Sequence, residues 1–163
     1  MYIGLLSDTH GVFSDEFREF LAPVDEIWHA GDFGGGLETA QEIAAFKPLV
    51  GVCGNCDNRD LLYDYPLHQV FDRDGVKVLM THIGGYPGRY DLRARALIDS
   101  ERPGLFVCGH SHILKVMFDH QYNMMTMNPG AAGLQGWQVV RTALRFRIDS
   151  GRIHSLEVFE LPR

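Results

Sequence analysis

The sequence predicts an α/β fold, a four-layer sandwich of two stacked mixed β-sheets flanked by helices. Two observations predict this fold class. Apolar β-rich runs alternate with helical patterns through the first two thirds of the 163 residues, as in βαβ units. Residues 115–161 then give only short strands and turns. One sheet could hardly bury both halves, so we expect two sheets packed together in a single domain over residues 1–163.

The expected strands of the α/β part are short apolar runs at residues 2–7, 26–31, 48–54 and 105–110. Residues 68–82 predict a hairpin that turns at Asp74-Gly75, a dipeptide typical of two-residue turns. Beyond residue 115 we expect a β meander without a helix, with one turn at residues 149–151.

Three helices are expected, at residues 14–22, 37–46 and 89–100. In the first helix, Phe13, Phe17, Phe20 and Leu21 share one face, and Ser14 is suited to the N-cap position. A run of three glycines, at residues 34–36, precedes the second helix.

Composition excludes several classes of partner. The formal net charge is −6, so no overall basic field attracts nucleic acid or anionic lipid. No run of about 18 apolar residues is present, which argues against a membrane span. The first residues lack a signal-peptide pattern, and the three cysteines are an odd number. We therefore expect a cytoplasmic protein with no membrane or specific nucleic-acid partner, and leave a homo-oligomer open.

Five apolar runs end in the same way, with an oxygen or nitrogen ligand at the carboxyl end of the expected strand. In open α/β sheets, sites form outside these carboxyl ends, so five separate segments could converge on one point. The residues concerned are Asp8, His10, Asp32, Asn55, His82, His110 and His112.

Seven such side chains are too many for one metal ion, but two ions that share a carboxylate need seven or eight donors. Asp32 stands alone after its strand and is our candidate for the bridge. The D-x-H and H-x-H spacings would point both end residues the same way if each triplet were extended. Imidazole with carboxylate favours Mn, Fe, Zn, Co or Ni. Two such ions can activate a bridging water for in-line attack on phosphorus, with no protein nucleophile.

A different chemistry is suggested by Cys53 and Cys56, whose C-x-x-C spacing occurs in zinc half-sites and redox pairs. No second cysteine or histidine pair at zinc-finger spacing accompanies them, and Cys53 falls within an expected strand. We therefore interpret the spacing as coincidental and assign the ligand atom of this segment to the side-chain oxygen of Asn55.

These segments resemble the motifs of the calcineurin-like metallophosphoesterase superfamily, in order and over most of the chain. The chain looks most like the small bacterial and archaeal branch of phosphodiesterases. The resemblance implies a two-sheet sandwich and two divalent transition-metal ions, Mn²⁺ being favoured and Zn²⁺, Fe²⁺, Ni²⁺ or Co²⁺ being alternatives. It implies that one ion is held by Asp8, His10, Asp32 and His112, and the second by Asp32, Asn55, His82 and His110. The matching motifs are Asp8-Thr9-His10, Gly31-Asp32, Gly54-Asn55-Cys56-Asp57, His82 and Gly109-His110-Ser111-His112.

Two departures from the family pattern bear on activity. Many relatives have histidine at position 56, where it can act as a general acid, but this chain has Cys56. Ile83-Gly84 follow His82, where the small branch often has Gly-His. Alkoxide leaving groups need a proton donor and good leaving groups do not, so we expect modest activity that favours activated esters.

Other residues have two interpretations each. Asp57 could orient Asn55 or a histidine, or be an exposed turn aspartate. Arg89 could contact substrate phosphate, although a solvated helix face is the simpler explanation. Tyr86 could cover the site mouth or be ordinary loop packing. His29, inside an expected strand, is interpreted as structural rather than catalytic.

The sequence thus predicts a metal-dependent phosphoesterase, and a phosphodiesterase in particular, acting on a small phosphate ester. Asp8, Asp32, Asn55 and His82 are the residues expected to carry the chemistry. A phosphomonoesterase is the first alternative. The second is a non-catalytic protein-interaction scaffold of the same fold, because some relatives serve as binding modules.

Overall fold

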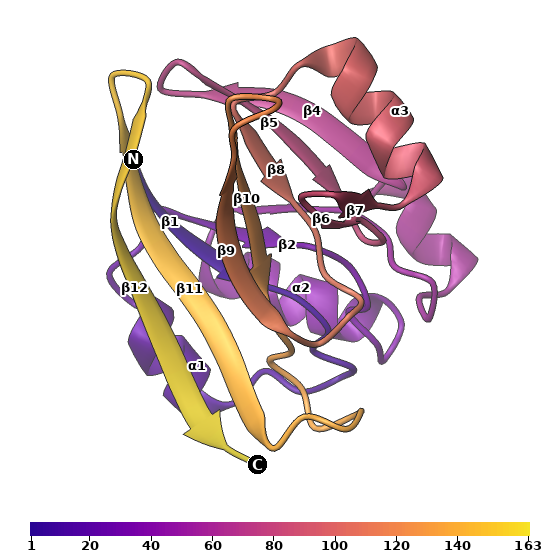
Figure 1. Cartoon of the computed structure of the whole chain (residues 1–163). Coiled ribbons are helices and arrows are strands. Elements are labelled where there is room, and N and C mark those ends of the chain that lie inside the picture. The colour runs from indigo at the N-terminus through magenta and orange to yellow at the C-terminus, as the bar shows by residue number, and fades with distance from the viewer.

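The computed structural model describes residues 1–163 and contains two five-stranded sheets that pack face to face (Figure 1). The first sheet has the strand order β12-β11-β1-β2-β3. Strands β1, β2 and β3 are parallel to one another, whereas β11 and β12 add in antiparallel fashion. The strands of this sheet are β1 (Tyr2–Leu6), β2 (Glu26–His29), β3 (Leu49–Gly51), β11 (Val140–Asp149) and β12 (Arg152–Pro162).

The second sheet has the order β4-β5-β8-β10-β9, with β5, β8 and β10 parallel and the two outer strands antiparallel. Its β4–β5 hairpin turns at Asp74 and Gly75, whose φ angles of 49° and 83° suit a primed two-residue turn, as predicted. A small ribbon, β6 (Gly85–Tyr86) with β7 (Arg89–Tyr90), lies beside this sheet. The strands of the sheet are β4 (His68–Arg73), β5 (Val76–Thr81), β8 (Leu105–Val107), β9 (Leu114–Asp119) and β10 (Met124–Pro129).

Helices cover the outer faces of both sheets, which completes the four predicted layers. Helices α1 (Asp15–Leu21) and α2 (Leu37–Phe46) pack on the first sheet, and α3 (Leu92–Glu101) packs on the second (Figure 1). A 3₁₀ helix spans Arg59–Tyr63. None of the helices is long and apolar enough to cross a membrane.

Both faces of β1 and β2 are buried, which explains why β1 is a continuous apolar run. In β1, Ile3 and Leu5 point into the layer between the sheets, while Tyr2 and Leu6 pack against the helices. The layer between the sheets is centred on Trp28, which is fully buried and meets Phe146 edge to face. This packing fixes the two sheets relative to each other and so aligns the ends of their strands.

Three local expectations need correction. Ser14 occupies the N-cap position of α1, but its side chain makes no capping hydrogen bond. The third helix begins at Leu92 instead of residue 89, because Arg89 and Tyr90 pair within the small ribbon. The last four strands are not one meander. Strands β9 and β10 join the second sheet and β11 and β12 join the first, because β10 pairs with β8 and β11 pairs with β1.

Candidate metal centre

The seven predicted ligand residues lie on the loops that directly follow five strands. These strands are β1, β2 and β3 of the first sheet and β5 and β8 of the second. Their ligand-type atoms form three overlapping clusters, and within each cluster the atoms lie within 4.8 Å of one another. The clusters consist of Asp8 with His10 and His112, of Asp32 with His82 and His110, and of His10 with Asp32 and Cys56.

Asp8 is fully buried, and one of its oxygens has no hydrogen-bond donor. Its Oδ2 accepts a hydrogen bond of 3.1 Å from the backbone N–H of His110. Its Oδ1 lies 3.2 Å from Nε2 of His112 and 3.9 Å from Nε2 of His82, close enough for ion pairs but without hydrogen-bond alignment. A buried carboxylate oxygen without a donor is unfavourable unless a positive charge compensates it.

The Asp32 carboxylate lies between two histidines. Its Oδ2 is 3.2 Å from Nε2 of His82 and 3.9 Å from Nε2 of His10, and its Oδ1 accepts a hydrogen bond of 2.8 Å from the Cys56 backbone N–H. Burial alone would raise the pKa of Asp32, but the hydrogen bonds and charge of His82 and the Cys56 amide outweigh it and hold the pKa well below its usual value. Asp32 is therefore ionised at neutral pH.

His82 is held in one orientation by the backbone. Its Nδ1 donates a hydrogen bond of 2.7 Å to the Ala30 carbonyl, which directs Nε2 toward Asp32 and, at 3.1 Å, toward Oδ1 of Asn55. Burial alone would lower the pKa of His82, but Asp32 and Asp8 outweigh burial and raise it. Nε2 of His82 can therefore bind either a metal cation or a proton.

His112 is oriented by a side chain that sequence reasoning missed. Its Nδ1 lies 3.0 Å from Oε1 of Gln138, whose amide nitrogen donates to the carbonyls of Gly133 and Gln135 at 3.3 and 2.6 Å. These two donations point Oε1 at the imidazole, so Nδ1 of His112 carries the proton and Nε2 faces Asp8. The nearby Asp8 carboxylate raises the pKa of His112 despite partial burial. No motif links Gln138 to His112, because the two are separated by 26 residues.

The backbone around the ligands is not extended. This corrects the expectation that the D-x-H and H-x-H triplets point their end residues the same way as extended segments. Five of the seven candidate ligand residues have positive φ, in the left-handed region that costs an L-residue conformational energy. Both triplets therefore place their end residues in the clusters through left-handed turns and not through the pleat of a strand. The residues and their φ angles are Asp8 (55°), His10 (46°), Asp32 (57°), His110 (66°) and His112 (58°).

Glycine before a ligand allows close backbone approach at two of the motifs. A Cβ atom on Gly54 would overlap the Asp32 carboxylate, so the loop that carries Asn55 could not lie so near Asp32 with any other residue. Gly31 has a φ of 96°, and a Cβ atom there would lie 2.6 Å from Nδ1 of His82. The Gly-Asp and Gly-Asn pairs are thus explained by packing around the ligands.

The two residues after Asn55 have different roles in the structure. Asp57 contacts neither Asn55 nor a histidine: its carboxylate accepts hydrogen bonds from the backbone N–H groups of Gly54 (2.8 Å) and Gly34 (3.1 Å) and so ties two loops together. Cys56 is exposed and lies in a cluster with His10 and Asp32. Burial and the Asp32 charge raise the pKa of its thiol, which is therefore protonated at neutral pH.

Two clefts flank the ligand cluster and share Ile83 and Asp91. The His110 cleft, of about 370 Å³, includes His110 and Arg89, so Arg89 lines a cleft beside the cluster and is not on a helix face. The His82 cleft, of about 580 Å³, includes His82 and Asn55. The other lining residues of the His110 cleft come mainly from β6, β7, β9 and the loops around them. Those of the His82 cleft come mainly from α3 and the β3–β4 connection.

His29 does not take part in the cluster but supports the loop beneath it, in agreement with its interpretation as structural. It is fully buried and stacks on Phe33 with ring centroids 3.7 Å apart. Its Nδ1 accepts from the Gly31 N–H at 3.2 Å, so its Nε2 donates to Oγ1 of Thr9, 3.0 Å away. Burial lowers its pKa to about 3.

We expect acidification to destabilise the metal-free protein partly through His29. The folded-state pKa of about 3 lies below the value of about 6.5 in the unfolded chain, so only the unfolded state binds this proton between these values, and stability falls as pH drops through that window. His29→Gln should be less stable at pH 8 yet lose less stability between pH 7 and 5, measured by urea unfolding. The exposed His120→Gln is the control, and an unchanged pH slope in His29→Gln would contradict the assignment.

The chain matches the model of the calcineurin-like phosphoesterase superfamily domain over residues 1–151. Among solved structures, it resembles zinc-bound wild-type Vps29 of Entamoeba histolytica (16% identity, TM-score 0.75, 99% of each chain covered). It also resembles a Thermotoga maritima protein solved by NMR (25%, 0.72, 98% of this chain and 99% of that one). A third relative is described as a novel archaeal phosphodiesterase (21%, 0.71, 98% and 100%).

No curated protein sequence matches the chain. The family match, however, extends over all five strand-end loops that form the candidate metal centre. The fold of the structural relatives agrees with it, since both sheets and their helices are covered almost completely. The chain belongs to the calcineurin-like phosphoesterase superfamily.

Proposed function

We propose that this protein is a phosphodiesterase that uses two divalent transition-metal ions. Family membership supports a metal-dependent phosphoesterase, and the observation that carries the proposal further is the environment of Asp8. A fully buried carboxylate oxygen without a donor faces the Nε2 atoms of two histidines whose Nδ1 protons are already engaged. Such an arrangement is suited to a cation bound between these atoms.

The candidate ligand atoms fit divalent transition-metal ions. Asp8 and Asp32 raise the pKa values of His82 and His112, so a metal ion would compete with protons for their Nε2 atoms. Imidazole with carboxylate and amide oxygen is suited to Mn²⁺, Zn²⁺, Fe²⁺, Co²⁺ or Ni²⁺. We favour Mn²⁺. Zn²⁺ is the first alternative, because the Entamoeba Vps29 was crystallised with Zn²⁺.

We assign the ligands in two sets that share Asp32. Its carboxylate lies between His10 and His82, which supports a bridging role. One set is Asp8, His10, Asp32 and His112, and the other is Asp32, Asn55, His82 and His110, in accord with the clusters of the structure.

The bound ions would supply Lewis acidity, activating water and neutralising charge on the phosphoryl oxygens. The chain's own residues supply orientation. The Ala30 carbonyl and Gln138 fix two imidazoles, and the Cys56 N–H fixes the Asp32 carboxylate. Neither Ser111, which is between two proposed ligands, nor any other side chain is needed as a nucleophile.

A diester is favoured over a monoester by the two clefts. They flank the cluster on the His110 side and on the His82 side, so each can receive one arm of a phosphodiester. A monoester would leave one cleft without a substrate group. We further propose a cytoplasmic location, which is supported by three cysteines that are all free.

Hydrolysis of bis(4-nitrophenyl) phosphate tests the proposal. Purified protein, stripped of metal by a chelator, is assayed with and without added Mn²⁺, and 4-nitrophenyl phosphate is assayed in parallel. We expect turnover that depends on Mn²⁺ and favours the diester. Preference for the monoester would indicate a phosphomonoesterase, and absence of metal-dependent turnover would indicate the interaction scaffold instead.

Gln138 provides a further prediction about the metal site. Gln138→Leu removes the acceptor that holds the Nδ1 proton of His112, so we expect about a 10- to 100-fold weaker affinity for Mn²⁺, measured by titration calorimetry. The control is Gln121→Leu, on an exposed turn away from the cluster. Wild-type affinity in Gln138→Leu would show that Gln138 does not orient the ligand.

A further inference from the structure

We infer that the His110 cleft binds a second anionic group, such as a phosphate or phosphonate, on one arm of the substrate. The inference rests on the proposed phosphodiesterase function and names its substrate class: a phosphodiester with one negatively charged arm. It is carried by two cations that line this cleft beside the ligand cluster, Arg89 on β7 and Lys115 on β9.

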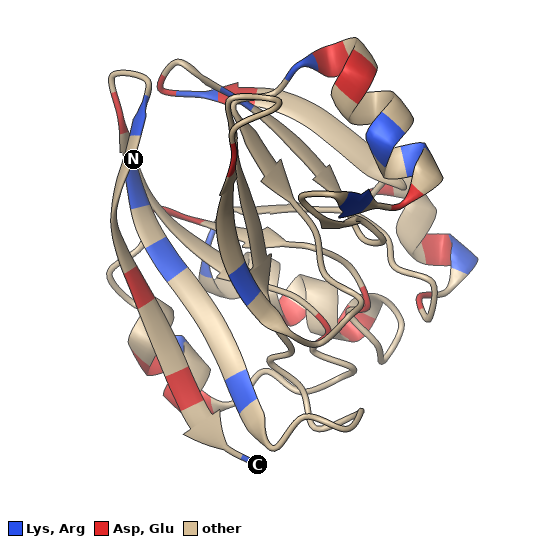
Figure 2. Cartoon of the chain, in the orientation of Figure 1, with Lys and Arg blue, Asp and Glu red and all other residues tan.

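Neither of these cations is paired with a carboxylate. Some basic side chains do form ion pairs, as in Arg73 with Glu26 and Arg145 with Glu157; what distinguishes Arg89 and Lys115 is that both line one cleft beside the ligand cluster. In a chain with a net charge of −6, two unpaired cations in one cleft leave a local positive charge that an anion would compensate. Figure 2 shows the two basic positions on β7 and β9.

The carboxylate that also lines the cleft, Asp91, does not neutralise them. It caps α3, and its Oδ1 accepts hydrogen bonds from the backbone N–H groups of Arg93 and Ala94 at 2.9 and 3.3 Å. The helix N-terminus itself carries partial positive charge, which this carboxylate balances. The charges of Arg89 and Lys115 therefore remain available to a ligand.

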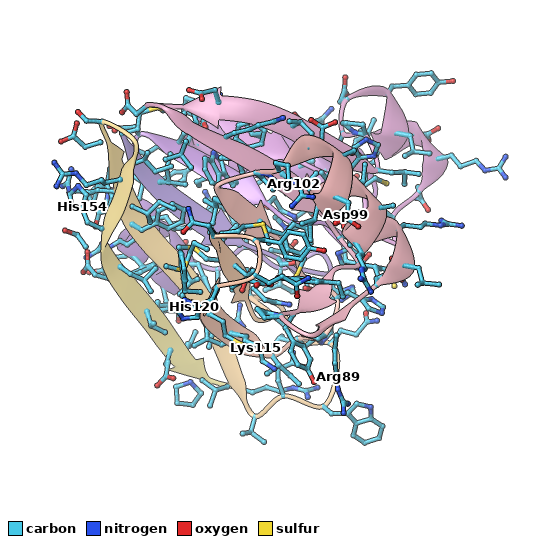
Figure 3. All side chains as sticks on the ribbon, turned by 45° about the horizontal axis from the view of Figure 1, so that its top comes forward. Arg89, Asp99, Arg102, Lys115, His120 and His154 are labelled. Atoms are coloured by element: carbon cyan, nitrogen blue, oxygen red, sulfur yellow. The ribbon has the colours of Figure 1, made fainter.

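Lys115 is positioned without loss of its donors. Its half-buried side chain places Nζ 3.6 Å from the centroid of the Tyr86 ring. This cation–π contact holds the ammonium group over the cleft wall, while its three N–H donors make no hydrogen bond within the protein. Figure 3 labels Lys115 and Arg89 in the lower part of the view.

The end of the cleft nearest the cluster is polar but neutral. Oγ of Ser111 accepts from Asn128 Nδ2 (3.1 Å) and from the Ile113 N–H (3.3 Å), which leaves its own proton free to donate. His110, the neutral donor Ser111 and the two cations thus line the same cleft. The His82 cleft is lined by a single cation, Arg93, where the His110 cleft has two.

Two substrates with one leaving group test the inference. Both are 4-nitrophenyl phosphodiesters, one with a propyl arm and one with a 3-phosphonopropyl arm, assayed with Mn²⁺. We expect the wild type to have about a tenfold higher kcat/KM for the phosphonopropyl diester, because charge-assisted hydrogen bonds to the arm are gained. A ratio of one or less would overturn the inference.

Variants locate the effect in the cleft. Lys115→Met keeps most of the stem and should reduce the preference about threefold or more while leaving the propyl diester within twofold of wild type. Arg89→Gln keeps a polar group and should also reduce the preference about threefold or more. Arg152→Gln, which removes an exposed cation at the start of β12, is the matched control and should keep the preference. Equal losses on both substrates, or an unchanged preference, would overturn the inference.

A measurement without metal separates this inference from the proposed function. Inorganic phosphate is titrated into metal-free protein, and the side-chain resonances of Lys115 and Arg89 are followed by NMR. We expect saturable shifts of both resonances in the wild type, and loss of the Arg89 shift in Lys115→Met. If neither diester is turned over, the proposed function fails, and the NMR shifts alone then test whether the His110 cleft binds an anion. Absence of the shifts would overturn the inference.

Discussion

Asp32→Asn is expected to abolish metal-dependent hydrolysis of bis(4-nitrophenyl) phosphate, lowering kcat/KM by at least about 10³-fold. The change removes one negative charge from the position between His10 and His82, where the proposed ions share a ligand. Charge stabilisation by metal is worth several kcal/mol in the transition state, and each 1.36 kcal/mol is tenfold in rate. The measurement is the difference in kcat/KM with and without Mn²⁺.

The asparagine should preserve the fold. Its Oδ1 can still accept the hydrogen bond from the Cys56 backbone N–H, which anchors the Asp32 side chain at 2.8 Å. Circular dichroism and thermal unfolding check this point, and His82→Ala gives an independent removal of a proposed ligand. Asp15→Asn, at an exposed position on α1, serves as the control with the same charge change. Turnover of Asp32→Asn within threefold of wild type would contradict the shared-ligand proposal.

The second large effect concerns the leaving group. We expect kcat/KM to fall by about a hundredfold or more from a nitrophenyl diester to a diester with a simple alkyl leaving group. Cys56 stands where many relatives have histidine, and its raised thiol pKa makes it a poor proton donor at neutral pH. General acid catalysis contributes typically about 10²–10⁴-fold, and good leaving groups do not need it. The measurement is a series of diesters that differ only in leaving-group pKa.

Cys56→His should recover part of this loss. The sulfur of Cys56 clusters with His10 and Asp32, so an imidazole at this position can reach the leaving group. We expect roughly a 10²-fold gain for alkyl leaving groups and little change for nitrophenyl ones. Asn58→His, on the same exposed loop but outside the clusters, controls for an added imidazole. A flat dependence on leaving-group pKa in the wild type would indicate that another residue donates the proton.

Much of the fold could be predicted because buried faces of strands and helices require apolar residues at regular positions in the sequence. Strand β1 has both faces buried and reads as an apolar run, and the α2 helix at Leu37–Phe46 has the predicted bounds. The polar residues after these runs stand out because they interrupt continuous apolar segments. Five strand ends therefore identify the candidate ligands, and the Gly-Asp and Gly-Asn pairs follow from close packing at the same loops.

Partners far apart in sequence could not be predicted in the same way. The local pattern of β10 does not specify its neighbour, and in the structure β10 pairs with β8 while β11 lies in the other sheet. Asp57 bonds backbone amides of two loops, and Gln138 reaches His112 from a loop with no regular structure. Arg89 lies in a cleft because it pairs within the small ribbon instead of starting a helix.

The sequence by itself determined which residues are available for metal chemistry, and the order in which the strands present them. Only the tertiary structure decided how they converge: five of them adopt left-handed backbone angles, and their partners come from loops on both sheets. The physical reason is that the burial of a strand or helix produces an apolar periodicity that is visible within a short segment of sequence. Left-handed turns and contacts between distant loops are stabilised only by the packing of the complete chain.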